Sequence, residues 1–439
     1  MPPPMPASAF LPFSTIASTP ASKTVLVPAQ VPHLSCTVMT SYKYEQLLDP
    51  QSYIRILTLK SGKFDDPLKG SLSMEQLAAK PAYEAISYVW GAPDTPHHIQ
   101  LEQGSSSVSM AITENLNFAL RRLRHNSEDR RLWTDAICIN QEDDDEKSHQ
   151  VREMTQIYCA AKTVLIYLGE QGDNTQQAFK LLDQIYNASK ATAPEDTRSH
   201  MIWIRDHALP SAREPLAWEP LKAFFCRPWF MRKWTIQEAA VASKALLFCG
   251  DWTADWDLLE VVHHAIYKHG LAVLDHTTCK NQAMAKELQQ GLTQLNSLVR
   301  VKNFWKRNGR YQLMDLVYQF QTARAKDPRD HLFALLGLAA EADDPDLRPE
   351  YKSNSMEKNA ERYARRFLHL KGNLEVLYRA GLQGHDLKLP SWVSATKFHY
   401  IRAITDRARF QIGMAHMIPS HLNTPKDRGI LCADLASTM

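Results

Sequence analysis

Glycine is scarce in this chain, and its spacing excludes two classes of nucleotide-binding protein. Only 16 of the 439 residues are glycine, and the first is Gly62. An average protein has about 7% glycine. Neither G-x-G-x-x-G nor G-x-x-x-x-G-K-[ST] occurs, although a backbone needs such loops to cradle the phosphates of a bound cofactor. A Rossmann dehydrogenase and a P-loop NTPase are therefore not expected.

The chain also lacks a strong excess of positive or negative charge, and it has no long apolar run. The chain has 51 basic and 48 acidic side chains and a net charge of +3, too even a balance to predict a nucleic-acid partner. The best apolar run, Leu332 to Ala340, contains Gly337 and is far shorter than the roughly 18 residues of a spanning helix. We therefore expect a soluble protein without a membrane span, and we do not expect nucleic acid as its partner.

The cysteines and histidines show no metal-binding or disulfide pattern. The seven cysteines are odd in number, scattered and never in C-x-x-C spacing, so neither a disulfide framework nor a zinc ribbon is expected. The histidine pairs at 97–98 and 263–264 lack H-E-x-x-H spacing. These features predict no metal and no cofactor, and a reducing, cytoplasmic location.

The N-terminal segment differs in composition from the rest of the chain. Eight of the 24 prolines lie in the first 32 positions, and no acidic residue precedes Glu45. This composition predicts a disordered tail over residues 1–44. We expect an α/β domain over 45–250 and a mainly helical region over 251–439.

Short apolar runs alternate with helical periodicity in the predicted α/β domain. This alternation is typical of a doubly wound, mostly parallel sheet. We expect strands at 54–59, 83–90, 132–139, 163–168 and 245–249, and helices from about 113, at 142–161 and at 175–186. Further helices are expected at 219–225, 229–242, 255–269, 282–301, 313–323 and 356–370.

The carboxyl ends of parallel strands are where such sheets bind ligands. Three segments would lie at that edge of the predicted sheet: Trp90-Gly91, Cys138 to Gln141, and the loop after Leu168.

Four stretches combine aromatic and charged residues in an unusual way. The first ends a strand with two Tyr and a Trp, and the second places Asp135 inside an apolar strand. The third opens a helix with two Trp and ends at Glu238, and the fourth is a charged stretch before an apolar turn. They are Tyr83 to Gly91, Trp133 to Gln141, Arg227 to Glu238, and Asp327 to Asp330 with the following His331 to Leu338.

These four stretches, in this order, resemble the fungal heterokaryon incompatibility (HET) domain. The family patterns are Y-x-A-[LI]-S-Y-x-W-G, W-x-D-x-I-C-I-N-Q, R-x-W-x-x-Q-E and D-x-R-D-x-x-[FY]-A-L-L-G-L, and all four are matched almost letter for letter. The resemblance covers about residues 42–350. It implies that the α/β domain over 45–250 is a HET domain. It also implies a role in fungal non-self recognition, with programmed death of incompatible cells and with other incompatibility proteins or further copies of itself as partners.

The HET family is in turn similar to the TIR fold, a doubly wound, flavodoxin-like domain whose enzymatic members cleave NAD with a Glu on a helix after a Trp. That similarity implies Glu238 as the catalytic carboxylate and Trp234 as its neighbour on the same helical face. NAD would then be a substrate and not a cofactor.

The chemistry of NAD cleavage suits such residues. Breaking the bond between nicotinamide and ribose creates an oxocarbenium-like transition state, which a fixed carboxylate stabilises. An indole offers a face for the departing ring, and Arg227 or Arg232 suits the pyrophosphate. The predicted substrate-binding residues are Tyr88, Trp90, Asp135, Asn140, Gln141, Arg232 and Trp234.

Each of these residues also fits a purely structural role. Glu238, beside Arg and Lys, suits a solvated ion pair, and Asp135 suits either a ligand site or a carboxylate that accepts backbone N–H groups at a turn. Tyr88 and Trp90 are alternatively core aromatics. Asn140 and Gln141 are alternatively caps of the next helix, and the charged turn at 327–330 is alternatively an ion pair.

Two functions stay open on the sequence alone. One is an NAD hydrolase, and the other is a non-catalytic module that signals by self-association or by binding a partner, with the Trp and Arg residues at an interface. A concave pocket lined by Trp234, Glu238 and Asp135 would favour the enzyme.

Overall fold

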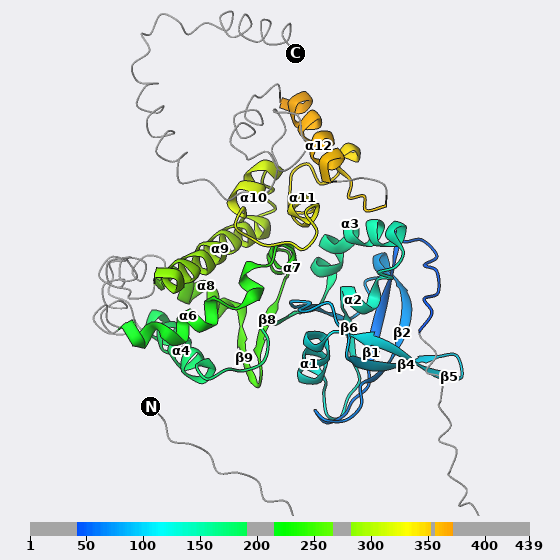
Figure 1. The fold of residues 1–439 in the computed structure, drawn as a ribbon, viewed down its shortest axis with the longest axis horizontal. Helices are drawn as coiled ribbons and strands as arrows, with labels where there is room; N and C mark the ends of the chain where they lie inside the picture. Colours follow the sequence, from blue (N-terminus) through cyan, green and yellow to red (C-terminus); the bar gives the residue numbers. More distant parts are fainter. Residues whose placement is uncertain (1–41, 191–214, 267–281, 353–355, 372–439) are drawn as a thin grey trace, which may run out of the picture. The chain divides into compact units, whose positions relative to one another are not determined.

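The computed structural model describes residues 42–190, 215–266, 282–352 and 356–371 (Figure 1). The predicted tail lies almost entirely outside the described residues, as does the predicted helical region after 371, and the division at residue 250 stays a prediction. In the described part of the chain, no helix combines the length and the apolar character needed to cross a membrane.

The described residues form one mixed sheet with helices around it, which confirms the α/β class. The strand order is β5-β4-β2-β1-β6-β3-β7-β8-β9. The strands are β1 (Tyr53–Leu59), β2 (Lys69–Gln76), β3 (Glu84–Ser87), β4 (His97–Gln103), β5 (Ser106–Ile112), β6 (Arg130–Trp133), β7 (Val164–Tyr167), β8 (Ala245–Cys249) and β9 (Trp252–Asp255).

The prediction of a mostly parallel sheet is wrong. Of the neighbouring strand pairs, β2/β4, β6/β3, β3/β7 and β7/β8 are parallel, and β1/β2, β1/β6, β4/β5 and β8/β9 are antiparallel. The strands missed from the sequence are β2, β4, β5 and β9, and the first three carry many polar side chains. Apolar runs detect strands buried on both faces, such as β7, whose four residues are all buried.

The helices largely follow the predicted periodicity. Thr113 caps the first of them, since its side chain accepts a hydrogen bond from the Leu116 N–H. The helices are α1 (Glu114–Leu123), α2 (Asp135–Cys138), α3 (Asp144–Ala160), α4 (Thr175–Lys190), α6 (Glu219–Phe225), α7 (Trp234–Ala240), α8 (Trp256–Ala265), α9 (Gln282–Lys306), α10 (Leu313–Gln319), α11 (Asp330–Leu336) and α12 (Met356–Lys371).

The predicted strand over 132–139 is wrong in its second half. Strand β6 ends at Trp133, and the Thr134 carbonyl then accepts hydrogen bonds from Ile137 and Cys138, which starts the short helix α2. A continuous apolar run does not distinguish a buried strand from a buried helical turn. Asp135 is therefore the first residue of a helix, directly after a parallel strand.

The predicted helix over 229–242 is broken at Arg232. A 3₁₀ turn over Pro228–Met231 comes first, and α7 begins only at Trp234. Between them the backbone pairs with a distant segment: the Arg324 N–H donates to the Met231 carbonyl, and the Lys233 N–H donates to the Arg324 carbonyl at 2.8 Å. This pairing extends the backbone at Arg232, which therefore cannot continue the helix.

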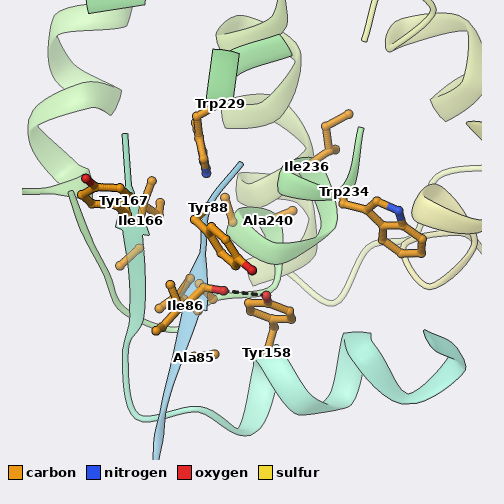
Figure 2. Close-up of a cluster of buried hydrophobic side chains, with 14 of the residues drawn as sticks. Ala85, Ile86, Tyr88, Tyr158, Ile166, Tyr167, Trp229, Trp234, Ile236 and Ala240 are labelled. Carbon is orange, nitrogen blue, oxygen red and sulfur yellow. Dashed lines mark hydrogen bonds between the residues drawn. The ribbon is translucent and has the colours of Figure 1, made fainter. Parts of the chain in front are cut away.

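Helix α7 packs against β3 and β7 and contacts α3, α9 and α11. Figure 2 shows the buried cluster beneath it, where the Tyr158 hydroxyl of α3 donates a hydrogen bond to the Ile86 carbonyl of β3 at 2.9 Å. Helix α7 lies at the carboxyl end of β3, because the hydroxyl of Ser87, the last residue of β3, donates a hydrogen bond to Glu238 of α7.

Candidate functional site

A cavity of about 1010 Å³ lies beyond the carboxyl ends of β3 and β6. All four motif stretches line it, although more than 200 residues separate the first from the last. They contribute Trp90 and Gly91, then Asp135, Ile139 and Gln141, then Pro228, Met231, Arg232 and Trp234, and finally Asp327, Pro328, Arg329 and Asp330.

Asp135 is the buried carboxylate at the wall of the cavity. Its Oδ2 accepts a hydrogen bond from the Trp90 indole at 3.0 Å, and its Oδ1 accepts one from the Ala136 N–H at 2.9 Å. Burial raises the pKa of the carboxyl, and the nearby Arg232 guanidinium partly offsets that effect. Asp135 therefore accepts a backbone N–H at a turn, as the structural alternative predicts, and it also borders the cavity, while its role as a ligand-site carboxylate stays a prediction.

Arg232 is held at the cavity wall by the first motif. Its guanidinium donates to the Tyr88 carbonyl and lies 5.9 Å from the centre of the Trp90 ring. The extended backbone between the 3₁₀ turn and α7 gives Arg232 this position.

Trp234, the first residue of α7, also lines the cavity. Its indole donates to the carboxylate of Asp330, whose Oδ1 also accepts a hydrogen bond from the Tyr351 hydroxyl at 2.7 Å. Burial raises the pKa of Asp330. Trp234 thus connects the third motif to the fourth.

Glu238 is not among the residues that line the cavity, and its side chain is buried, with the residue 1% exposed. The Ser87 hydroxyl donates to its Oε2, and the Ser87 oxygen accepts from the Trp229 indole at 2.9 Å. Burial raises the pKa of the Glu238 carboxyl to about 7. Spacing correctly placed Trp234 and Glu238 on one short helix, but only Trp234 reaches the cavity.

Of the remaining predicted residues, one lines the cavity and two do not. Gln141 lines the cavity and donates to the Asp135 carbonyl at 2.8 Å. Asn140 does not line it, and its Oδ1 accepts from the Glu142 N–H at 3.2 Å, before α3. Tyr88 is 2% exposed and lies within the buried cluster of Figure 2.

The structure therefore brings together five of the predicted site residues. Those at the cavity are Trp90, Asp135, Gln141, Arg232 and Trp234. Those away from it are Tyr88, Asn140 and Glu238.

Several charged residues of the cavity were not predicted. Lys147 of α3 lies with its Nζ 4.6 Å from the centre of the Tyr351 ring, and Arg324 and Lys326 precede the fourth motif. Arg329 pairs with Asp327 at 2.7 Å, as the predicted ion-pair turn requires, but this pair also lines the cavity. Sequence adjacency to the charged turn was the one available signal for Arg324 and Lys326.

Arg227, which the sequence suggested for the pyrophosphate, does not line the cavity. Its guanidinium donates to the Leu168 and Glu170 carbonyls at 3.0 Å each and to the Thr175 hydroxyl at 3.2 Å. It therefore holds the loop after β7, which was predicted at the site and is not part of the cavity lining. The described ranges contain no group of three or more His, Cys, Asp or Glu residues that could hold a metal ion.

Comparison with known proteins agrees with the motif resemblance. The family model of the heterokaryon incompatibility protein (HET) matches residues 83–238. The chain is similar to heterokaryon incompatibility protein 6, OR allele, of Neurospora crassa, with 24% identity over 447 aligned residues. The alignment covers 89% of this chain and 65% of that relative's length. No solved structure matches the chain significantly. Residues 83–238 of the chain therefore match the HET domain family of fungal heterokaryon incompatibility proteins.

Proposed function

We propose that this protein acts in fungal non-self recognition, that it promotes the death of incompatible cells from the cytoplasm, and that it does so by hydrolysing NAD in the cavity. One observation carries the enzymatic part: four separate motifs meet in a single cavity at the carboxyl ends of two parallel strands. The four described cysteines, all free thiols, are compatible with a reducing compartment.

The lining of the cavity suits a dinucleotide. Trp90 and Trp234 offer aromatic surface for a base or for the nicotinamide ring. Arg232 offers a planar cation suited to phosphate. The volume is at the upper end of the usual range of ligand pockets, about 300 to 1,000 Å³.

The position of the cavity supports a TIR-like relationship. Strands β6, β3, β7 and β8 form a parallel block within the mixed sheet. Ligands of doubly wound folds bind at the carboxyl ends of such strands. We propose that this block corresponds to the TIR-like core and that the antiparallel strands flank it.

The proposed reaction breaks the bond between ribose C1′ and the nicotinamide nitrogen, and the bonding electrons neutralise the pyridinium. Water then adds to C1′ and loses a proton, giving ADP-ribose, nicotinamide and H⁺. A carboxylate near the ribose stabilises the developing oxocarbenium charge.

Two carboxylates are candidates for this role. Asp135 borders the cavity and needs no rearrangement to face a bound ribose. Glu238, the predicted catalytic residue, is 1% exposed and bonded to Ser87, so its participation requires α7 or β3 to move when the ligand binds. The two roles predict different behaviour of the corresponding variants.

The test is nicotinamide release from NAD by the purified full-length chain, alone and as a forced oligomer. Asp135→Asn and Glu238→Gln are compared with the wild type, with the exposed Asp183→Asn of α4 as a matched control. We expect a loss of at least about 100-fold for the catalytic carboxylate and none for the control. Release by neither wild-type form, or undiminished release by both carboxylate variants, would disprove hydrolysis at this site.

The second candidate function is a non-catalytic module that binds a ligand, another incompatibility protein or a second copy of itself. The burial of Glu238 away from the cavity favours it. Ligand binding without any turnover, together with a ligand-dependent change in oligomeric state by light scattering, would support this candidate over the enzyme.

A further inference from the structure

Arg232 and Arg324 are direct partners in a parallel β-bridge. Partner residues of a bridge project their side chains from the same face, about 5 Å apart at their Cα atoms. Two like charges in such positions repel each other unless something neutralises them. The chain nevertheless places this pair at the wall of the cavity.

The two arginines differ in what already binds them. Arg232 donates to the Tyr88 carbonyl and lies against the Trp90 ring. Arg324 is fixed through its backbone alone, and its exposed side chain has no hydrogen bond or ion pair to any described residue. The exposed Lys326, two residues later, is equally without such a partner among the described residues.

The carboxylates of the cavity do not neutralise these two side chains. Asp327 forms its ion pair with Arg329, Asp330 accepts from Trp234 and Tyr351, and Asp135 lies nearest to Arg232 and Trp90. The cavity carries five cationic residues and three carboxylates: Lys147, Arg232, Arg324, Lys326 and Arg329 against Asp135, Asp327 and Asp330. A concave surface of this kind concentrates a positive field and attracts anions.

We propose that Arg324 and Lys326, beside Arg232, form a phosphate-binding subsite, and that the cavity takes a pyrophosphate-bearing nucleotide. The diphosphate lies on this wall, where a guanidinium binds phosphate oxygens in pairs and an ammonium acts as a point charge. The ring of the nucleotide contacts Trp90 or Trp234, which also line the cavity. The identification of that nucleotide as NAD rests on the proposed function, whereas the subsite does not.

Calorimetric binding to the full-length chain tests the subsite with three probes: ADP, adenosine and inorganic pyrophosphate. We expect the wild type to bind ADP at least tenfold more tightly than adenosine, since charge-assisted hydrogen bonds add to the binding of the ring. The preference should shrink as salt is raised, because salt screens exposed charges. In the double variant Arg324→Gln/Lys326→Gln, ADP should bind within about threefold of adenosine, and adenosine binding should not change.

The matched control is the double variant Arg300→Gln/Lys180→Gln, which removes the same charges from exposed positions outside the cavity lining. It should keep the wild-type preference for ADP. Both pairs are at exposed positions, so we expect both variants to fold, and circular dichroism checks this.

Three results would overturn the subsite: no ADP binding by the wild type up to millimolar concentration, equal affinity for ADP and adenosine, or an unchanged preference in the Arg324/Lys326 variant. Pyrophosphate binding as tightly as ADP would overturn the assignment to a nucleotide. If the wild type binds ADP through these two residues but releases no nicotinamide from NAD, the hydrolysis is disproved and the subsite is not. If the double variant releases nicotinamide with the same KM as the wild type, the subsite is disproved and the hydrolysis is not.

Discussion

The indole of Trp90 donates a hydrogen bond to the carboxylate of Asp135 at 3.0 Å and so joins the first motif to the second. Both residues border the same cavity, and each follows the carboxyl end of a parallel strand, β3 and β6. The bond orients the indole, and it partly offsets the burial that raises the pKa of the Asp135 carboxyl. This pair is the natural starting point for experiments on the site.

Replacement of Trp90 by Phe removes this donor, so the buried Asp135 carboxylate loses one of the hydrogen bonds that replace its contacts with water. We expect the free energy of unfolding to fall by about 1 to 3 kcal/mol at neutral pH, measured by urea denaturation. Trp252→Phe is the control, because the Trp252 ring stacks on Phe179 and its nitrogen has no hydrogen bond within the described residues. A loss no larger than that of the control would contradict the proposed orienting role.

The raised pKa of Glu238 predicts a specific pH dependence of stability. The folded carboxyl titrates at about 7 against the ordinary value of 4.5, so between these values the folded state holds a proton that the unfolded state has lost. The contribution of this group to stability therefore falls as pH rises through that window, by up to about 3 kcal/mol. It is constant below pH 4.5 and above pH 7.

Glu238→Gln removes that titration while its amide oxygen can still accept from Ser87. Urea denaturation at pH 5 and at pH 8 measures the free energy of unfolding of both proteins. That of the variant, relative to the wild type, should increase from pH 5 to pH 8. A difference between the two proteins that does not change with pH would show that the carboxyl has an ordinary pKa.

Ser87 connects Glu238 to Trp229, because its hydroxyl donates to the carboxylate and accepts from the indole. Ser87→Ala leaves two buried polar groups without this partner, and we expect a loss of about 2 to 4 kcal/mol in the free energy of unfolding. Ser73→Ala on β2 removes a half-buried hydroxyl bonded to Glu75 and should cost within about 0.5 kcal/mol. Equal effects of the two substitutions would show that the Ser87 network does not stabilise the fold.

The ion pair between Arg55 and Glu146 is buried, with side chains 3% and 6% exposed and 2.6 Å between the charged atoms. Glu146 of α3 also accepts the Asn140 N–H at 2.7 Å and so holds the end of the second motif. Glu146→Gln should destabilise the protein by about 3 to 5 kcal/mol, because it leaves the Arg55 charge buried without its counterion.

The exposed pair Lys60 and Asp129, at 3.1 Å with both side chains 40% exposed, is the control for that experiment. Asp129→Asn should lower the free energy of unfolding far less than Glu146→Gln, because solvent screens an exposed ion pair. Thermal or urea denaturation of both variants measures the two losses in stability. Similar losses would show that the buried ion pair stabilises the fold no more than an exposed one.

Much of the fold was predictable where local pattern and burial agree. The apolar run at 163–168 is strand β7, and Thr113 caps α1 as its side chain predicts. The run at 132–139 was misread because both halves are apolar and only the backbone bonds of Thr134 distinguish a strand from a helix. Strands β4 and β5 were missed because their polar residues are compatible with an antiparallel edge but produce no apolar run.

The sequence by itself indicated the resemblance to the HET domain, the positions of the parallel core strands and the four motif stretches, because each depends on residues that are close together in the chain. Only the tertiary structure decided which side chains meet. Glu238 and Trp234 share one short helix, yet β3 covers the first and the cavity receives the second. Arg324 joins Arg232 through backbone pairing across about 90 positions, and no local pattern encodes that contact, because its stabilisation comes from the packing of distant segments.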